Sequence, residues 1–247
     1  MTFLYALISV LIVSIISLIG IVTLWLRLSL LKRIVLRLVS FSAGALLGDV
    51  FFHLLPGIIH GSWRNITVSL RILGWIVFWL VTEKIIRRNH CHMPVTPHHT
   101  HPVALMNLIW DSVHNLIDGL IIWASYLVSI PVGIATTIAV VLHEIPQEIW
   151  DFGVLVHGGF SRRKALLLNF ITALTAVIGV IIAFLLYRYT NNMVAVLIPF
   201  AAGTFIYIAC SDLIPELHKE NSLAHNIPQI LFFLFGIWIM STLLFLE

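Results

Sequence analysis

The sequence predicts an all-α polytopic membrane protein with eight transmembrane helices. Of its residues, 60% are hydrophobic and only 10% are charged, and the mean hydropathy is +1.04. Soluble globular proteins carry about 25% charged residues, so this composition excludes a soluble fold. Apolar segments that approach or exceed the length needed to cross a bilayer follow one another along the chain.

The boundaries of the expected spans follow from charged and turn residues. The first span holds no charge, and no basic segment precedes its long apolar run, so we interpret it as a membrane span and not a signal peptide. Pro131 suits the first turn of the fifth span, where its missing N–H would have no partner anyway. The expected spans are Phe3–Leu26, Leu38–Ile59, Ile66–Val81, Val103–Ile130, Pro131–His157, Ala165–Tyr187, Met193–Leu217 and Ile227–Leu246.

Lysine and arginine are distributed unevenly between the two sides of this arrangement. All but three of the 14 lie at the loops after spans 1, 3, 5 and 7, and the exceptions are Arg64, Arg71 and Arg188. Because cytoplasmic loops are enriched in Lys and Arg, both termini are expected on the extracytoplasmic side. We expect residues 1–247 to form one transmembrane domain, with a cytoplasmic polar loop at 84–102.

Two parts of the chain resemble each other. Ala43-Gly44 is followed by His53-Leu-Leu-Pro56, and Ala202-Gly203 is followed by Asp212-Leu-Ile-Pro215, at a constant offset of 159 residues. Spans 2 and 7 would cross the membrane in opposite directions. We therefore predict an inverted repeat of spans 1–3 and 6–8 around spans 4 and 5, an arrangement typical of transporters. The alternative is a chance match between apolar helices.

Two polar strings interrupt the apolar helices near the centre of the bilayer. They are His114-Asn-Leu-Ile-Asp118-Gly119 on span 4 and His143-Glu-Ile-Pro-Gln-Glu148 on span 5. An ionised carboxylate there costs on the order of 3 kcal/mol on insertion scales. Residues three and four apart share a helix face, so each string offers imidazole and carboxylate ligands to one divalent ion, such as Zn²⁺, Fe²⁺ or Mn²⁺. The alternative is a set of structural polar residues that join helices by hydrogen bonds.

Other polar residues have weaker interpretations. Asn169 on span 6 is expected to serve packing or a helix–helix hydrogen bond, and the alternative is a ligand role. Five further acids and histidines share a helix face, Asp111 with the span 4 string and the others in pairs on spans 2 and 7. They could line an ion path; the alternatives for the two pairs are a simple interhelical pair or a snorkelling end residue. The five residues are Asp49, His53, Asp111, Asp212 and Glu216. The polar loop suggests exchangeable metal capture, the alternative being incidental histidines. Its candidate ligands are His90, Cys91, His92, His98, His99 and His101.

Two details of span 5 matter for function. Pro146 has no N–H, so the helix should bend and leave the carbonyl of Leu142 without its standard donor. His143-Glu144 begins like the HExxH motif of zinc hydrolases, but Gln147 in the fifth position breaks the motif. An intramembrane zinc hydrolase is therefore the alternative function. The sequence has no phosphate-binding glycine loop for a nucleotide and no basic patch with interleaved aromatics for a nucleic acid.

These features carry a family resemblance. The chain resembles the ZIP (Zrt-, Irt-like) metal-ion transporters over essentially its whole length, in the span layout, the His-rich loop and both polar strings. The resemblance implies a non-enzymatic homodimeric carrier that moves zinc, or Fe²⁺, Mn²⁺ or Cd²⁺, toward the cytoplasm. It implies a transport site with these metal ligands: His114, Asn115, Asp118, His143, Glu144 and Gln147, with Glu148 close by.

The chain departs from the family pattern in two places. Gln147 stands where the branch with this span 5 string often has a second histidine, so we expect a different affinity or metal preference. Span 6 has no acidic residue from Ala165 to Tyr187, whereas some branches use one to hold a second ion, and the sequence leaves the number of ions open. A plasma membrane of the bacterial inner type is expected, with an internal eukaryotic membrane as the alternative.

Overall fold

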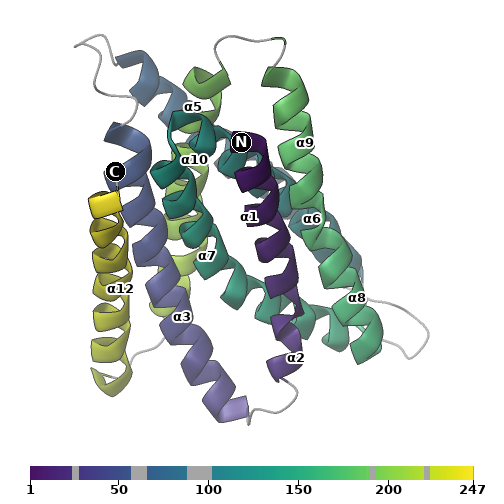
Figure 1. Cartoon of the computed structure of the whole chain (residues 1–247). Coiled ribbons are helices and arrows are strands. Elements are labelled where there is room, and N and C mark those ends of the chain that lie inside the picture. Colours follow the sequence, from purple (N-terminus) through teal and green to yellow (C-terminus); the bar gives the residue numbers. More distant parts are fainter. Residues whose placement is uncertain are drawn as a thin grey trace.

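The computed structural model describes residues 1–23, 28–56, 66–87, 102–187, 189, 193–219 and 223–246, and every regular element in these ranges is a helix (Figure 1). Within these described ranges, seven helical segments are long and apolar enough to cross a membrane: Thr2–Ile19, Arg33–Leu54, Ile66–Ile85, Ile130–His157, Arg162–Tyr187, Met193–Leu217 and Asn226–Leu243. The remaining expected span is α6 (Pro102–Val128), which has 27 residues and carries the first polar string. The chain is an all-α, multi-pass membrane protein, as predicted.

The elements follow the expected order of spans, and several spans are built from more than one helical piece. The first three spans are α1 (Thr2–Ile16), η1 (Ser17–Ile19) and α2 (Gly20–Thr23); α3 (Leu28–Asp49) and η2 (Val50–Leu54); and α5 (Ile66–Arg87). After α6 come α7 (Ile130–His157), α8 (Arg162–Ala173) and α9 (Thr175–Tyr187). The last two spans are α10 (Met193–Tyr207), η3 (Ile208–Leu213) and α11 (Ile214–Leu217); and α12 (Leu223–Leu243) with η4 (Leu244–Leu246).

Some helices extend beyond the apolar runs that predicted them. α3 begins at Leu28 and not at Leu38, and α5 ends at Arg87 and not at Val81. Charged residues end an apolar segment, but they do not interrupt the backbone hydrogen bonds of a helix that continues past the hydrocarbon. The start of α7 agrees with the sequence, since Pro131 lies in its first turn and Ser129 Oγ accepts the N–H of Val132 at 3.2 Å.

The helices form two groups that meet in the middle of the molecule. α1, α6, α7 and α9 pack against one another, while α3 pairs with α12 and α5 pairs with α10. The groups meet where α3 packs on α7 and α10 packs on α6. Within the first group the α6–α9 contact is very close, because a Cβ at Gly119 would collide with the carbonyl of Ala176. This contact fixes the part of α6 that carries Asp118.

Irregular segments recur at equivalent places in the two halves. η2 in span 2 and η3 in span 7 are both π-helical, and the helix is interrupted in span 1 after Ile16 and in span 6 at Leu174. The two interruptions touch, since Ser14 Oγ donates to the carbonyl of Ala173, 159 residues away, at 2.9 Å. α3 and α10 run in opposite directions, and both termini lie at one end of the bundle (Figure 1). These correspondences agree with the inverted repeat, which stays a prediction.

Candidate metal site

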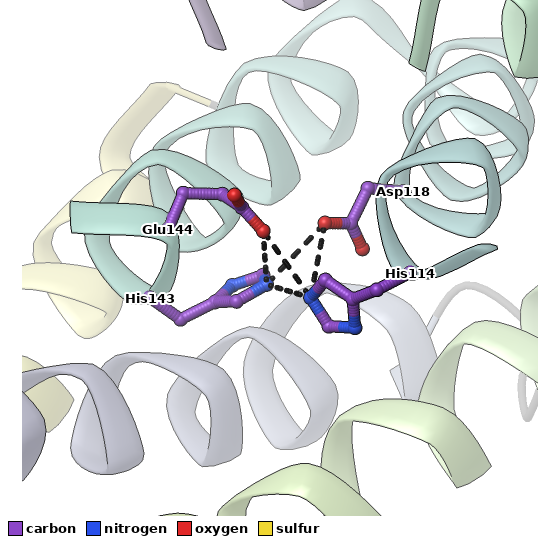
Figure 2. Close-up of side chains that lie close together, drawn as sticks. All are labelled: His114, Asp118, His143 and Glu144. Carbon is purple, nitrogen blue, oxygen red and sulfur yellow. Dashed lines mark hydrogen bonds and ion pairs between the residues drawn. The ribbon is translucent and has the colours of Figure 1, made fainter. Parts of the chain in front are cut away.

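α6 and α7 each direct one histidine and one carboxylate toward a common point (Figure 2). His114 and Asp118 lie one turn apart on α6, and His143 and Glu144 are neighbours on α7. One ligand atom from each residue lies within 4.8 Å of the other three. Among the described residues, this is the only group of three or more His, Cys, Asp or Glu side chains arranged in this way. We call these four residues the metal cluster.

Five of the six separations within the metal cluster are close to the edges of a tetrahedron around zinc, and all four ligand atoms lie within 4.8 Å of one another. His114 Nε2 lies 3.2 Å from His143 Nε2, 3.2 Å from Glu144 Oε1 and 3.5 Å from Asp118 Oδ2. His143 Nε2 lies 3.4 Å from Asp118 Oδ2 and 3.5 Å from Glu144 Oε1. The centre of a regular tetrahedron with such edges lies about 2.1 Å from each corner, which is the usual Zn–N and Zn–O distance.

The metal cluster is largely buried and rich in negative charge, and His114 is its most exposed member, with 11% of its side chain exposed. Asp118 is 0% exposed, and His143 and Glu144 are each 1% exposed. None of the four carboxylate oxygens of Asp118 and Glu144 has a hydrogen-bond partner. Buried carboxylates need compensation, and a divalent cation would neutralise both of these with the imidazoles as neutral ligands.

The ring of His143 is held in the orientation that metal binding needs. Its Nδ1 lies 3.0 Å from the carbonyl oxygen of Ala139. Because a carbonyl only accepts hydrogen bonds, Nδ1 carries the proton and Nε2 presents its lone pair to the cluster. Phe205 of α10 packs against the His143 ring, with the two ring centroids 5.8 Å apart, and the plane of the His114 ring is nearly perpendicular, at 89°, to that of His143. The second group of helices thus closes one side of the cluster.

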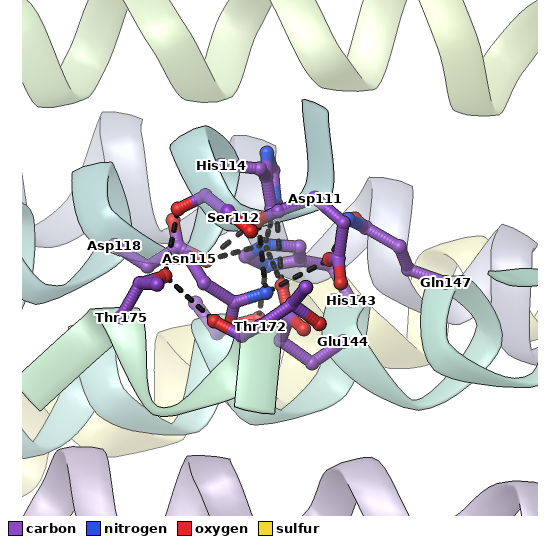
Figure 3. A network of polar contacts seen from close by, with 11 residues as sticks. Asp111, Ser112, His114, Asn115, Asp118, His143, Glu144, Gln147, Thr172 and Thr175 are labelled. Atoms are coloured by element: carbon purple, nitrogen blue, oxygen red, sulfur yellow. Dashed lines mark hydrogen bonds and ion pairs between the residues drawn. The ribbon is translucent and has the colours of Figure 1, made fainter. Parts of the chain in front are cut away.

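The two neutral candidate ligands lie beside the metal cluster in a polar network (Figure 3). Asn115 Nδ2 donates to Asp111 Oδ1 at 2.8 Å, and Gln147 Nε2 reaches the same oxygen at 3.5 Å. The amide oxygen of Asn115 is buried without a hydrogen-bond partner. Asn115 therefore keeps an oxygen for an ion, whereas the amide nitrogen of Gln147 is directed at Asp111.

Two further buried carboxylates follow along α7. Glu148 is 1% exposed, and its carboxylate oxygens have no hydrogen-bond partner. Asp151 accepts a hydrogen bond from Asn107 Nδ2 of α6 at 3.0 Å. Asn169 Nδ2 donates to the backbone carbonyl of Glu148 at 3.2 Å, so the helix–helix hydrogen bond predicted for Asn169 is confirmed. Acidic groups thus continue from the cluster along the α6–α7 contact.

The remaining candidate path residues lie apart from the metal cluster. Asp49 accepts hydrogen bonds from Thr136 Oγ1 of α7, at 3.1 and 3.3 Å, and His53 Nε2 donates to the carbonyl of Met240 at 2.9 Å. Glu216 pairs with Lys219 at 2.5 Å, and Asp212 is exposed. The contacts of Asp49 and His53 pair helices, which was one of their interpretations. The loop candidates at 90–92, 98–99 and 101 lie outside the described residues.

Sequence reasoning missed the hydroxyl groups that reach across from one helix group to the other. Thr136, the partner of Asp49, is one, and Ser42 of α3, which reaches the backbone of α7, is another. A serine or threonine in an apolar helix gives no sign of its partner, and no spacing rule connects residues on different helices. Only the unsatisfied carbonyl at Leu142, expected because of Pro146, indicated that such a donor was needed.

Comparison with known proteins decides the family. The family profile described as ZIP Zinc transporter matches residues 86–244. The chain is 30% identical over 254 residues to the zinc transporter ZIP13 of Mus musculus, which covers 85% of this chain and 70% of that protein. The chain belongs to the ZIP zinc transporter family.

Two nematode ZIP proteins are similar to the same degree. The identity is 30% over 264 residues with zinc transporter zipt-7.2 of Caenorhabditis elegans, covering 82% of this chain and 56% of that protein. The identity with zinc transporter zipt-7.1 of Caenorhabditis briggsae is 30% over 248 residues, covering 76% of this chain and 63% of that protein. The chain thus spans less than two thirds of the length of these two ZIP relatives. Membership of a ZIP transporter family leaves the hydrolase alternative without support, and Gln147 of the broken motif contacts Asp111.

Proposed function

We propose that this ZIP protein is a membrane carrier for zinc and that the metal cluster is its transport site. The tetrahedral arrangement of His114, Asp118, His143 and Glu144 carries the proposal, because its separations fit zinc at ordinary bond lengths. Two imidazoles and two carboxylates replace the hydration shell of the ion and cancel its charge. The family and the names of the similar proteins support the same cargo.

The ligand set suits a carrier because it permits release. Nitrogen and oxygen ligands hold a borderline ion less tightly than a thiolate cage does. The ligands come from two different helices, so a small shift of α6 against α7 would open the tetrahedron. Fe²⁺, Mn²⁺ and Cd²⁺ accept similar ligands and are the expected competitors. Asn115, Gln147 and Glu148 are proposed as accessory ligands beside the four.

The direction of transport follows from charge and from the acidic groups around the site. The Lys- and Arg-rich loops favour a cytoplasmic location for the end of the bundle opposite to the termini. We propose that ions leave the cluster past Asp111 and Glu148 toward that end. The proposed path also includes Asp49, His53, Asp212 and Glu216, which would act near the two membrane faces. The bacterial-type plasma membrane and the homodimer remain predictions.

The loop at 84–102 is proposed to collect metal on the cytoplasmic side of this single domain. Its histidines lack the paired spacing of a structural zinc site, so binding should be weak and exchangeable. Replacing the five loop histidines should change apparent affinity or regulation and leave uptake intact, because the transport site is elsewhere. Loss of uptake in a well-inserted variant would contradict this role.

Zinc uptake into proteoliposomes, with Fe²⁺, Mn²⁺ and Cd²⁺ as competitors, tests the proposed function. The parent protein should accumulate zinc down its gradient, and His143→Ala should abolish or strongly reduce uptake. His157→Ala is the matched control, because His157 lies on the same helix but is exposed. Equal uptake by the parent and by His143→Ala would show that the polar strings are structural and that the proposal is wrong.

A further inference from the structure

One hydrogen bond joins α3 to α7 directly beside the metal cluster. Ser42 Oγ lies 2.5 Å from the carbonyl oxygen of Leu142 and 2.7 Å from that of Leu38 in its own helix. Leu142 immediately precedes His143. Ser42 is 0% exposed, so its single hydroxyl proton must be used inside the protein.

The two acceptors are not equivalent. The standard donor for the carbonyl of Leu142 would be the N–H of residue 146, but that residue is Pro146 and has none. The carbonyl of Leu38 instead faces the backbone N–H of Ser42 within α3. A buried carbonyl without a donor is costly. The hydroxyl of Ser42 therefore stabilises the structure most by donating to Leu142.

We propose that Ser42 is a positioning residue of the metal site, an inference that rests on the proposed zinc-binding function. The carbonyl of Leu142 belongs to the same peptide plane as the nitrogen of His143. Fixing that oxygen restricts rotation of the backbone that carries His143 and Glu144. The ring of His143 is anchored to Ala139 within α7, whereas Ser42 donates a hydrogen bond from a different helix to the backbone of this ligand-bearing turn.

A second contact shows how α3 lies along α7. Thr136 Oγ1 donates to the carboxylate of Asp49 at 3.1 Å. Asp49 follows Ser42 along α3 while Thr136 precedes Leu142 along α7, so the helices are antiparallel and touch at two polar points about two turns apart. Only the Ser42 contact adjoins the ligands. Its loss should therefore affect zinc binding more than an equivalent loss elsewhere.

Zinc dissociation constants of purified full-length variants, measured by competition with a chelating dye, test the inference. Ser42→Ala should raise the zinc Kd by about 10- to 100-fold, the usual effect of losing a group that orients a metal ligand. Ser42→Thr keeps the hydroxyl and should stay close to the parent. Ser14→Ala is the matched control, because Ser14 Oγ also lies between a carbonyl of its own helix and one of another helix, at 2.8 and 2.9 Å, away from any ligand.

Pro146→Ala adds a direct test of the mechanism. It restores an N–H opposite the carbonyl of Leu142, so adding Ser42→Ala in this background should cost much less affinity than in the parent. If Ser42→Ala alone fails to insert, recovery of insertion and binding in the double variant supports the inference, and failure of the double variant overturns it.

Three results would overturn the positioning role. They are a parent-like Kd for Ser42→Ala, an equal loss in Ser14→Ala, and a loss that is undiminished in the Pro146→Ala background. His143→Ala, measured in parallel, separates the two proposals. If it binds zinc like the parent, the transport site itself is wrong, whereas if it loses zinc and Ser42→Ala does not, only the role of Ser42 fails.

Discussion

The dimensions of the metal cluster predict the coordination of bound zinc. Five of the six separations between its nitrogen and oxygen atoms are 3.2–3.5 Å, and a regular tetrahedron with such edges has its centre about 2.1 Å from each corner. Zinc added at one equivalent should therefore have a first shell of four nitrogen or oxygen atoms at about 2.0–2.1 Å and no sulfur. X-ray absorption spectroscopy measures both the distances and the type of ligand. The loop histidines and Cys91 should be replaced beforehand, so that only the membrane site is loaded.

His143→Ala removes one corner of this tetrahedron. The remaining three ligands and a water can still hold zinc, but affinity should fall by at least the roughly 10- to 100-fold that follows loss of an orienting partner alone. The imidazole contribution to the absorption spectrum should fall by half, because one of two histidines remains. His157→Ala should change neither quantity. A sulfur shell at about 2.3 Å, or a spectrum that His143→Ala leaves unchanged, would refute the assignment of the site.

Three further outcomes are expected. Gly119→Ala should lower the midpoint of thermal unfolding in detergent, because the new Cβ would collide with the carbonyl of Ala176 and overpacking costs about 1–3 kcal/mol. Gly74→Ala is the control and should be neutral or stabilising, because a Cβ at Gly74 would have no atom within 4 Å. Equal shifts of the midpoint in the two variants would contradict the packing argument. Gln147→Ala should weaken zinc binding much less than the loss of a cluster ligand, since its contact to Asp111 is long at 3.5 Å. In a protein whose native cysteines have been replaced, a thiol reagent should label Lys84→Cys only after the cells are permeabilised and should label Tyr189→Cys in intact cells. The reverse pattern would show that the proposed orientation in the membrane is inverted.

Much of this protein is determined by its sequence alone. Membrane insertion depends on the apolar content of each segment, which is a local property, so the expected spans all correspond to helices. The polar strings could also be predicted to hold a metal ion, because ionisable residues in a membrane span require a compensating partner. Helical periodicity placed His114 and Asp118 on one face of α6. The fixed offset between spans 2 and 7 also led to the prediction of an inverted repeat.

The tertiary structure decided which candidates meet. Periodicity fixes the face of a helix on which a residue lies, but it does not fix the rotation and register of α6 against α7. Those depend on packing, such as the close approach of α9 at Gly119 and the contact of Phe205 with His143. For this reason four of the seven proposed ligands come together in the metal cluster, whereas Gln147 is directed at Asp111. For the same reason no sequence pattern revealed that Ser42 supplies the donor that Pro146 removes, since that bond exists only when α3 lies against α7.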